Sequence, residues 1–139
     1  MSKYLNKGLF TSASEHWSTP KDLYRDLDQE FSFNDDPCPL NSLTDGLSRE
    51  WGTSTYVNPP YGQEISVWIK QAYKQSLLGK IIVMLLPART DTKWFHEYIM
   101  KAHEIRFLKG RLRFNESESN APFPSMVVVF KYKRDIEEG

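Results

Sequence analysis

Residues Lys80–Leu86, with the sequence KIIVMLL, decide the fold that we predict for this chain. The run from Ile81 to Leu86 has no polar side, which is typical of a central parallel strand covered by helices on both faces. It is far shorter than the roughly 20 apolar residues of a membrane-spanning helix. We therefore place this segment at the centre of a sheet.

Helical and β-prone patterns alternate on both sides of this segment. Apolar residues spaced three and four apart predict helices over about 20–30, 63–78 and 90–100. Short β-prone runs predict further strands at 31–33, 53–57, 104–108 and 125–133. Strands that alternate with helices indicate an open α/β sheet, in which ligands bind at the carboxyl ends of the strands.

The length of 139 residues fits a single domain, which we place at 16–134 between a flexible arm at 1–15 and a tail at 135–139. Cys38 is the only cysteine, which excludes an internal disulfide and a cysteine-rich zinc cluster. His16, His96 and His103 lack the spacing of metal ligands, so we expect no metal.

Eighteen basic and eighteen acidic residues give no net charge, but the charges are unevenly distributed. Residues 22–50 hold eight acids and two bases, whereas residues 89–113 hold seven bases and three acids. This asymmetry predicts a ligand cleft beside a phosphate-binding face, and solvated charge on helices is the alternative. The candidates for phosphate contact are Arg89, Lys93, Lys109, Arg111 and Arg113.

The tetrad Asn58-Pro59-Pro60-Tyr61 directly follows a β-prone run and is the strongest chemical signal. Two prolines offer carbonyl acceptors without backbone donors, Asn58 adds a side-chain acceptor, and Tyr61 adds a flat aromatic face. Such a site accepts hydrogen bonds from a planar amino group and stacks on the ring that bears it. Two acceptors would localise the lone pair of that amine for attack on an electrophilic methyl group. A Pro-Pro turn with a satisfied asparagine is the structural alternative.

The tetrad is similar to the catalytic motif of S-adenosylmethionine-dependent amino-methyltransferases. Over roughly 15–132, the chain resembles the phage-type DNA N6-adenine methyltransferases. The segments that carry this resemblance are 17–20 (WSTP), 31–33 (FSF), 36–39 (DPCP), 45–47 (DGL), Trp51, 58–61 (NPPY), 86–92 (LPARTDT), 94–95 (WF) and 110–114 (GRLRF). The glycine-rich first loop of methyltransferases is missing, and DPCP stands in its place.

The resemblance implies a minimal Rossmann-like methyltransferase sheet, mostly parallel with an antiparallel C-terminal strand and flanking helices. It implies that Asn58 and the Pro59 carbonyl hold the amine of a flipped adenine. Pro60 and Tyr61 would complete the catalytic tetrad, and the Tyr61 ring would stack on the base. Base flipping is required because that amine lies inside the duplex stack.

The resemblance also implies that S-adenosylmethionine is the cofactor and suggests the residues that bind it. Thr19 and Pro20 would contact its methionine part, Asp36 its ammonium, and Asp45 its ribose. Plain structural roles remain open at three of these positions: Thr19 as a helix cap, Asp36 as a turn residue and Asp45 as the start of an Asp-Gly turn.

The expected partner is double-stranded DNA, and a homodimer could supply basic contacts that a neutral chain lacks. The sequence has no leader peptide, so we expect a cytoplasmic protein, in the host cell if a phage encodes it. Two alternatives stay open: methylation of RNA or of a protein glutamine, and a degenerate methyltransferase fold that binds nucleic acid without catalysis.

Overall fold

A computed structural model describes residues 17–39, 45–113 and 121–132 of the chain. Its longer elements, in chain order, are α2 (Lys21–Phe31), β1 (Ser54–Val57), α3 (Ile65–Ser76), β2 (Ile81–Pro87), α4 (Lys93–Glu97), β3 (Glu104–Phe107) and β4 (Ser125–Lys131). Two short 3-10 helices occupy Gly46–Ser48 and Ile99–Lys101. The predicted arm at 1–15 and the predicted tail at 135–139 lie outside the described residues.

The four strands form one mixed sheet in the order β1-β2-β4-β3. Strand β1 pairs parallel with β2, whereas β4 pairs antiparallel with both β2 and β3. Strands β1, β2 and β3 therefore share one direction and the C-terminal strand runs against them, as predicted. Because β4 inserts between β2 and β3, only one of the three strand pairs is parallel. The sheet is therefore not mostly parallel, as we had expected it to be.

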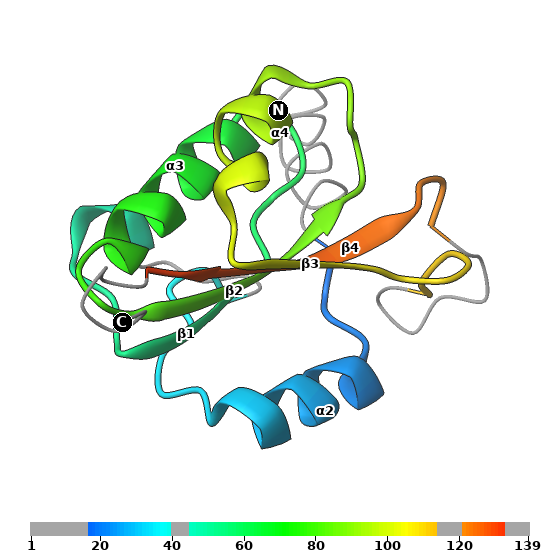
Figure 1. The fold of residues 1–139 in the computed structure, drawn as a ribbon. Coiled ribbons are helices and arrows are strands. Elements are labelled where there is room, and N and C mark those ends of the chain that lie inside the picture. The colour runs from blue at the N-terminus through cyan, green and yellow to red at the C-terminus, as the bar shows by residue number, and fades with distance from the viewer. Residues whose placement is uncertain (1–16, 40–44, 114–120, 133–139) are drawn as a thin grey trace, which may run out of the picture.

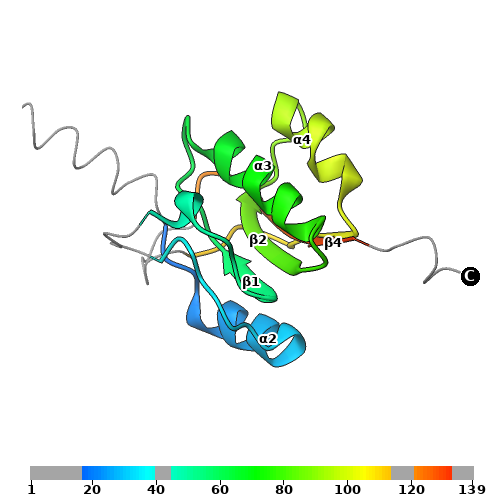
Figure 2. The ribbon, with the colours of Figure 1, turned by 90° about the vertical axis from the view of Figure 1, so that its left-hand side faces the viewer.

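Helices cover both faces of this sheet, with α2 on one face and α3 and α4 on the other (Figures 1 and 2). Residues Ile82–Pro87 of β2 and Ser125–Phe130 of β4 are all buried between these layers. The prediction that the KIIVMLL segment supplies a central strand covered on both sides is confirmed, but this strand pairs parallel only with β1.

The chain after α2 differs from the prediction. Helix α2 continues through Phe31 and ends where Ser32 adopts a left-handed conformation with φ 52°. The predicted strand at 31–33 is therefore wrong, because Phe31 completes the apolar stripe of the helix. The β structure starts later and consists of one parallel bridge between Asp35 and Thr55 of β1.

The predicted helix over 90–100 is shorter and divided. The side chain of Thr92 caps α4 by accepting a hydrogen bond of 3.2 Å from the backbone nitrogen of Phe95. At Tyr98 the backbone leaves the helical region with φ −122°, and a 3-10 turn follows. This turn places Ile99 in the core with 0% exposure, five residues before β3 begins.

Candidate active site

The carboxyl ends of β1, β2 and β3 lie along one edge of the sheet, since these strands share a direction. Asn58 follows β1, Arg89 lies two residues after β2, and Lys109 lies two residues after β3. Asp36 follows the bridge residue Asp35, which pairs parallel with β1. Residues that are distant in the sequence thus lie along the edge where ligands bind in α/β folds.

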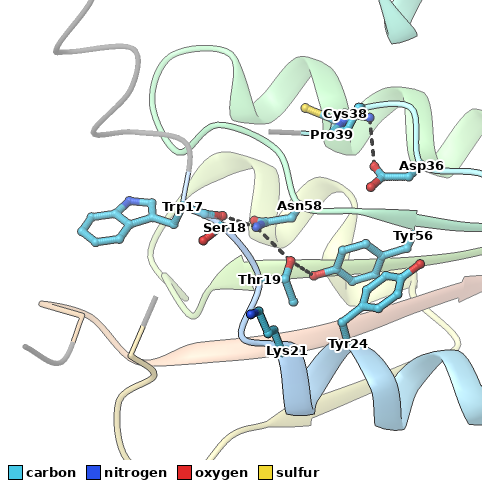
Figure 3. A pocket seen from close by; sticks show the side chains of 10 residues that line it. All are labelled: Trp17, Ser18, Thr19, Lys21, Tyr24, Asp36, Cys38, Pro39, Tyr56 and Asn58. Atoms are coloured by element: carbon cyan, nitrogen blue, oxygen red, sulfur yellow. Dashed lines mark hydrogen bonds between the residues drawn. The ribbon is translucent and has the colours of Figure 1, made fainter. Parts of the chain in front are cut away.

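A pocket of about 330 Å³ opens at the β1 end of this edge. Its volume falls within the range of small-molecule sites, roughly 300–1,000 Å³. The residues that line it are Trp17, Ser18, Thr19, Lys21, Tyr24, Asp36, Cys38, Pro39, Tyr56 and Asn58 (Figure 3). The pocket therefore brings together Thr19, Asp36 and Asn58, three of the residues singled out from the sequence.

The side chain of Asn58 is held by the segment that precedes α2. Its amide nitrogen donates to the backbone oxygen of Trp17 and, over 3.2 Å, to Oγ1 of Thr19. Thr19 Oγ1 also lies 2.6 Å from the phenol oxygen of Tyr56 (Figure 3). The alternative that Thr19 caps α2 is wrong, because its hydroxyl is engaged in this network and Pro20 occupies the N-cap without a side-chain cap.

Asp36 faces the same pocket and is partly buried. Its Oδ1 accepts a hydrogen bond of 3.2 Å from the backbone nitrogen of Cys38. Burial raises the pKa of the Asp36 carboxyl, and the neighbouring Asp35 charge adds to the rise. A partly desolvated carboxylate at a pocket wall is suited to pairing with a cationic ligand group.

Cys38 also lines the pocket, and its side chain is 9% exposed. Burial raises the pKa of its thiol to about 12, with the charges of Asp36 and Glu64 contributing. The thiol is therefore protonated at neutral pH, and thiolate is the form that attacks electrophiles. Its burial and its raised pKa therefore favour a packing role for Cys38 over a nucleophilic one.

The rest of the tetrad lies beside the pocket and not in its lining. Pro59 is buried and Pro60 is partly exposed. Tyr61 is 8% exposed, and its ring packs edge-on against Phe123 with 5.5 Å between the ring centres. Its hydroxyl donates a hydrogen bond of 2.9 Å to the backbone oxygen of Leu85. The structure thus shows an anchoring contact of Tyr61 that sequence reasoning did not foresee.

Two residues that we had assigned to the cofactor lie outside the pocket lining. Pro20 ends the segment that forms one wall and begins α2. Asp45 is exposed and caps the 3-10 helix Gly46–Ser48, where its Oδ1 accepts a hydrogen bond of 3.0 Å from the backbone nitrogen of Leu47. This geometry supports the turn-forming alternative for Asp45.

The five candidate phosphate contacts are all exposed. Lys93 pairs with Glu97 in the same helix over 3.6 Å, so part of its charge is compensated. Lys109, Arg111 and Arg113 alternate with the partly buried Leu112 in the segment after β3. Arg89 follows the carboxyl end of β2, the other three follow that of β3, and none of the four lines the pocket. We call these four residues the basic row.

Comparison with known proteins adds an independent observation. Residues 8–137 match the family model of DNA N-6-adenine-methyltransferase (Dam). The chain belongs to this family. It is 29% identical over 142 residues to the DNA N-6-adenine-methyltransferase of Haemophilus phage HP1 (strain HP1c1), covering 88% of this chain and 82% of that protein. It is also 33% identical over 109 residues to that of Escherichia phage T1, covering 69% of this chain and 45% of the relative.

The DNA N-6-adenine-methyltransferase family comprises enzymes that methylate adenine in DNA, and S-adenosylmethionine is the usual methyl donor of methyltransferases. Within the part of the chain that the structure describes, no helix is long and apolar enough to cross a membrane. The same residues contain no group of three or more histidine, cysteine or acidic side chains that could hold a metal ion.

Seven residues that line the pocket were not among the site residues assigned from the sequence, namely Trp17, Ser18, Lys21, Tyr24, Cys38, Pro39 and Tyr56. Tyr56 carried a usable signal, because it lies two residues before Asn58 and side chains two apart in a strand share a face. Tyr24 carried a weaker one, since it lies one position off the apolar stripe of α2. The sequence alone does not reveal that α2 lies against β1.

Proposed function

We propose that this chain transfers the methyl group of S-adenosylmethionine to the N6 amine of a flipped adenine in DNA, on a minimal Rossmann-like methyltransferase sheet. The observation that carries the proposal is the position of Asn58. Its amide lies at the carboxyl end of β1, 4% exposed, in a pocket that also holds the Asp36 carboxylate. A hydrogen-bonding amide and a cation-binding carboxylate in one pocket match the two reactants, an amine and a sulfonium amino acid.

The pocket has the chemistry that the methyl donor requires. The Asp36 carboxylate would pair with the donor ammonium, and Lys21 at the opposite wall would pair with its carboxylate. The ring of Tyr24 offers apolar surface for the nucleoside and for the sulfonium, which is attracted to aromatic faces. The absence of a glycine-rich loop is explained if these side chains supply the contacts that such a loop makes elsewhere.

The Asn58 side-chain oxygen and the Pro59 carbonyl would accept hydrogen bonds from the two hydrogens of the adenine amine. These bonds draw the amine lone pair out of the ring system and orient it toward the bound donor, which supplies an electrophilic methyl group. When bound, the donor would supply the methyl carbon and keep the electron pair of its carbon–sulfur bond. The surplus proton of the methylated amine would then pass to water. Alignment of the two reactants accounts for much of the expected rate.

The first role that we propose for Tyr61 is to hold the turn that carries the Asn58 and Pro59 acceptors. Little of its ring is exposed, so a flipped base stacked on it would use only a narrow face. Its position directly after the acceptors still supports contact with the base. Flipping itself follows from chemistry, because the amine of a stacked adenine cannot reach a methyl group outside the helix.

The basic row of Arg89, Lys109, Arg111 and Arg113 is proposed to bind DNA phosphates beside the pocket. Strands in a sheet lie roughly 4.8 Å apart, so β3 lies about 14 Å from β1 in this four-strand order. That separation allows backbone contacts on the duplex that flanks a flipped nucleotide. Phosphate contacts position the enzyme and carry no sequence information.

The proposal is tested by offering labelled S-adenosylmethionine with three acceptors: unmethylated duplex DNA, single-stranded RNA and a glutamine-containing peptide. Label that enters only the duplex supports it. Label in the RNA or peptide alone, with donor binding intact by calorimetry, would assign the site to another amine. Binding of DNA with neither donor binding nor transfer would indicate a degenerate, non-catalytic fold.

A further inference from the structure

The orientation of the Asn58 amide is decided by what its nitrogen faces. An asparagine amide has an acceptor end and a donor end of almost equal size, so packing alone selects neither orientation. In this structure the nitrogen end faces the backbone oxygen of Trp17, which can only accept a hydrogen bond. The reversed amide would place two acceptor oxygens against each other, so the Trp17 carbonyl selects one orientation.

Thr19 supports the same orientation from a second direction. Its Oγ1 lies 3.2 Å from the Asn58 amide nitrogen and 2.6 Å from the phenol oxygen of Tyr56. Tyr56 is 2% exposed, and burial raises the pKa of its phenol well above the usual value. The phenol thus keeps its proton and can donate it to Thr19, whose oxygen is then an acceptor facing the Asn58 nitrogen.

Tyr56 is itself a rigid support. It lies in β1, where it pairs with Val83 of the central strand, and its ring packs edge-on against Tyr24 at 5.1 Å between ring centres. Three groups therefore form a chain from the sheet to the amide: the Tyr56 phenol, the Thr19 hydroxyl and the Asn58 nitrogen (Figure 3). One end of this chain, Tyr56, lies in β1, and the other, Asn58, is the first residue after this strand.

We propose that Thr19 and the backbone oxygen of Trp17 are positioning groups, which hold the Asn58 amide so that its oxygen is presented to the acceptor amine. This inference rests on the proposed function, because it assumes that the Asn58 oxygen accepts a hydrogen bond from the reacting amine. It gives the segment 17–19 a catalytic purpose besides contact with the donor. An amide that rotated freely would spend time with its NH2 group facing the amine, a donor against a donor.

The test compares Thr19→Val, which removes the hydroxyl at nearly constant shape, with Thr19→Ser, which keeps it. We expect Thr19→Val to lower kcat about tenfold while the Kd for S-adenosylmethionine changes less than about threefold. Thr19→Ser should recover most of the lost rate. Thr53→Val is the matched control, because the Thr53 hydroxyl accepts a hydrogen bond from Asn34 at an exposed site outside the pocket lining and should not affect kcat.

A second readout does not depend on activity. The side-chain NH2 resonance of Asn58, identified by its loss in Asn58→Ala, should shift and exchange faster in Thr19→Val and in Tyr56→Phe. It should remain close to wild type in Thr19→Ser. This measurement tests the orientation even if the wild-type protein transfers no methyl group to DNA, which would overturn the proposed function but not the positioning contact.

Two results would overturn the inference. One is a Thr19→Val variant with wild-type kcat, or with a loss confined to donor affinity, which would leave Thr19 as a donor contact alone. The other is an unchanged Asn58 resonance in Thr19→Val. If Thr19→Val does not fold, Tyr56→Phe replaces it in the test, because this variant removes the phenol hydroxyl that contacts Thr19. A wild-type kcat or an unchanged Asn58 resonance in Tyr56→Phe would then overturn the inference.

Discussion

The hydroxyl of Tyr61 donates a hydrogen bond of 2.9 Å to the backbone oxygen of Leu85, one residue past the point where β1 stops pairing with β2. The turn after β1 is thereby tied to the central strand at the place where the strand ladder ends. The acceptors of Asn58 and Pro59 lie within this tied turn. Their position thus depends on a contact that faces the core and not the ligand.

We expect Tyr61→Phe to lower the free energy of unfolding by about 1–2 kcal/mol, because the buried Leu85 oxygen loses its donor. The ring contact with Phe123 is kept in this variant, so the fold itself should survive. Denaturant unfolding monitored by tryptophan fluorescence measures the change. A variant of wild-type stability that has lost methyl transfer would show instead that the hydroxyl acts on the substrate.

Gly46 lies close to the backbone of Pro37, and the neighbours of Pro37, Asp36 and Cys38, line the pocket. A Cβ placed on Gly46 would lie 1.9 Å from the backbone oxygen of Pro37, so one of the two backbones must move. We expect Gly46→Ala to cost about 2 kcal/mol of stability and to weaken donor binding, because Asp36 and Cys38 flank Pro37. Thermal unfolding and calorimetry measure the two effects.

Gly79→Ala is the matched control for that variant. Gly79 has φ 94° and open space around its Cα, and it precedes β2 at the opposite edge of the sheet. The left-handed conformation should cost roughly 1 kcal/mol without affecting donor affinity. Equal loss of donor affinity in both glycine variants would mean that Gly46 acts only through general stability.

Asp36 gives the pH dependence of donor binding. Because burial raises its pKa, the carboxylate becomes protonated at a higher pH than an ordinary aspartate as acid is added. The affinity for the donor should therefore fall as the pH decreases through the raised pKa of Asp36. Asp36→Asn should weaken donor binding about tenfold at pH 7.5 and remove the pH dependence of that binding. Calorimetric titrations from pH 5 to pH 8 test it, and a wild-type pH profile in Asp36→Asn would contradict it.

The effect of the same carboxyl on folding has the opposite sign. A carboxyl with a raised folded-state pKa contributes stability that is greatest below its unfolded pKa and is lost as pH rises through the folded value. Without the donor, Asp36→Asn should therefore be at least as stable as wild type at neutral pH. Reduced stability would show that Asp36 is chiefly a turn residue held by its bond to Cys38.

The basic row predicts the salt dependence of DNA binding. Each phosphate contact contributes a slope of about 0.9 in the logarithm of affinity against the logarithm of salt concentration. Lys109→Gln combined with Arg111→Gln should reduce the slope by about 2. Lys74→Gln, in the last turn of α3, is the control and should leave it unchanged. A slope that none of these variants changes would exclude this row as the DNA-binding face.

The central part of the fold was predictable because its signals are local. An unbroken apolar run predicted β2, and an alternation of patterns predicted the flanking helices. The antiparallel direction of the C-terminal strand was implied only by the family resemblance. The insertion of β4 between β2 and β3 was not predictable, since pairing between distant strands depends on packing that no local pattern records. The same reason explains the strand wrongly expected at 31–33, where Phe31 fits both the helical and the strand period.

The candidate site was predictable where chemistry and position coincide in the sequence. Asn58 and Asp36 each follow a β-prone run, and both line the pocket. The bonds from Asn58 to Trp17 and to Thr19 join residues 41 and 39 positions apart, so they could not be read from spacing. Asp45 carries the same acidic side chain as Asp36, and only the fold shows that it caps a turn outside the pocket lining.

The most direct test of the account is the identity of the methylated product and its dependence on Asn58. Unmethylated duplex DNA is incubated with labelled S-adenosylmethionine and the enzyme, then digested to nucleosides and separated by chromatography. We expect label in N6-methyladenine with the wild-type chain, and at least a hundredfold less with a folded Asn58→Ala variant. Label in another nucleoside, or equal N6-methyladenine from both proteins, would contradict it.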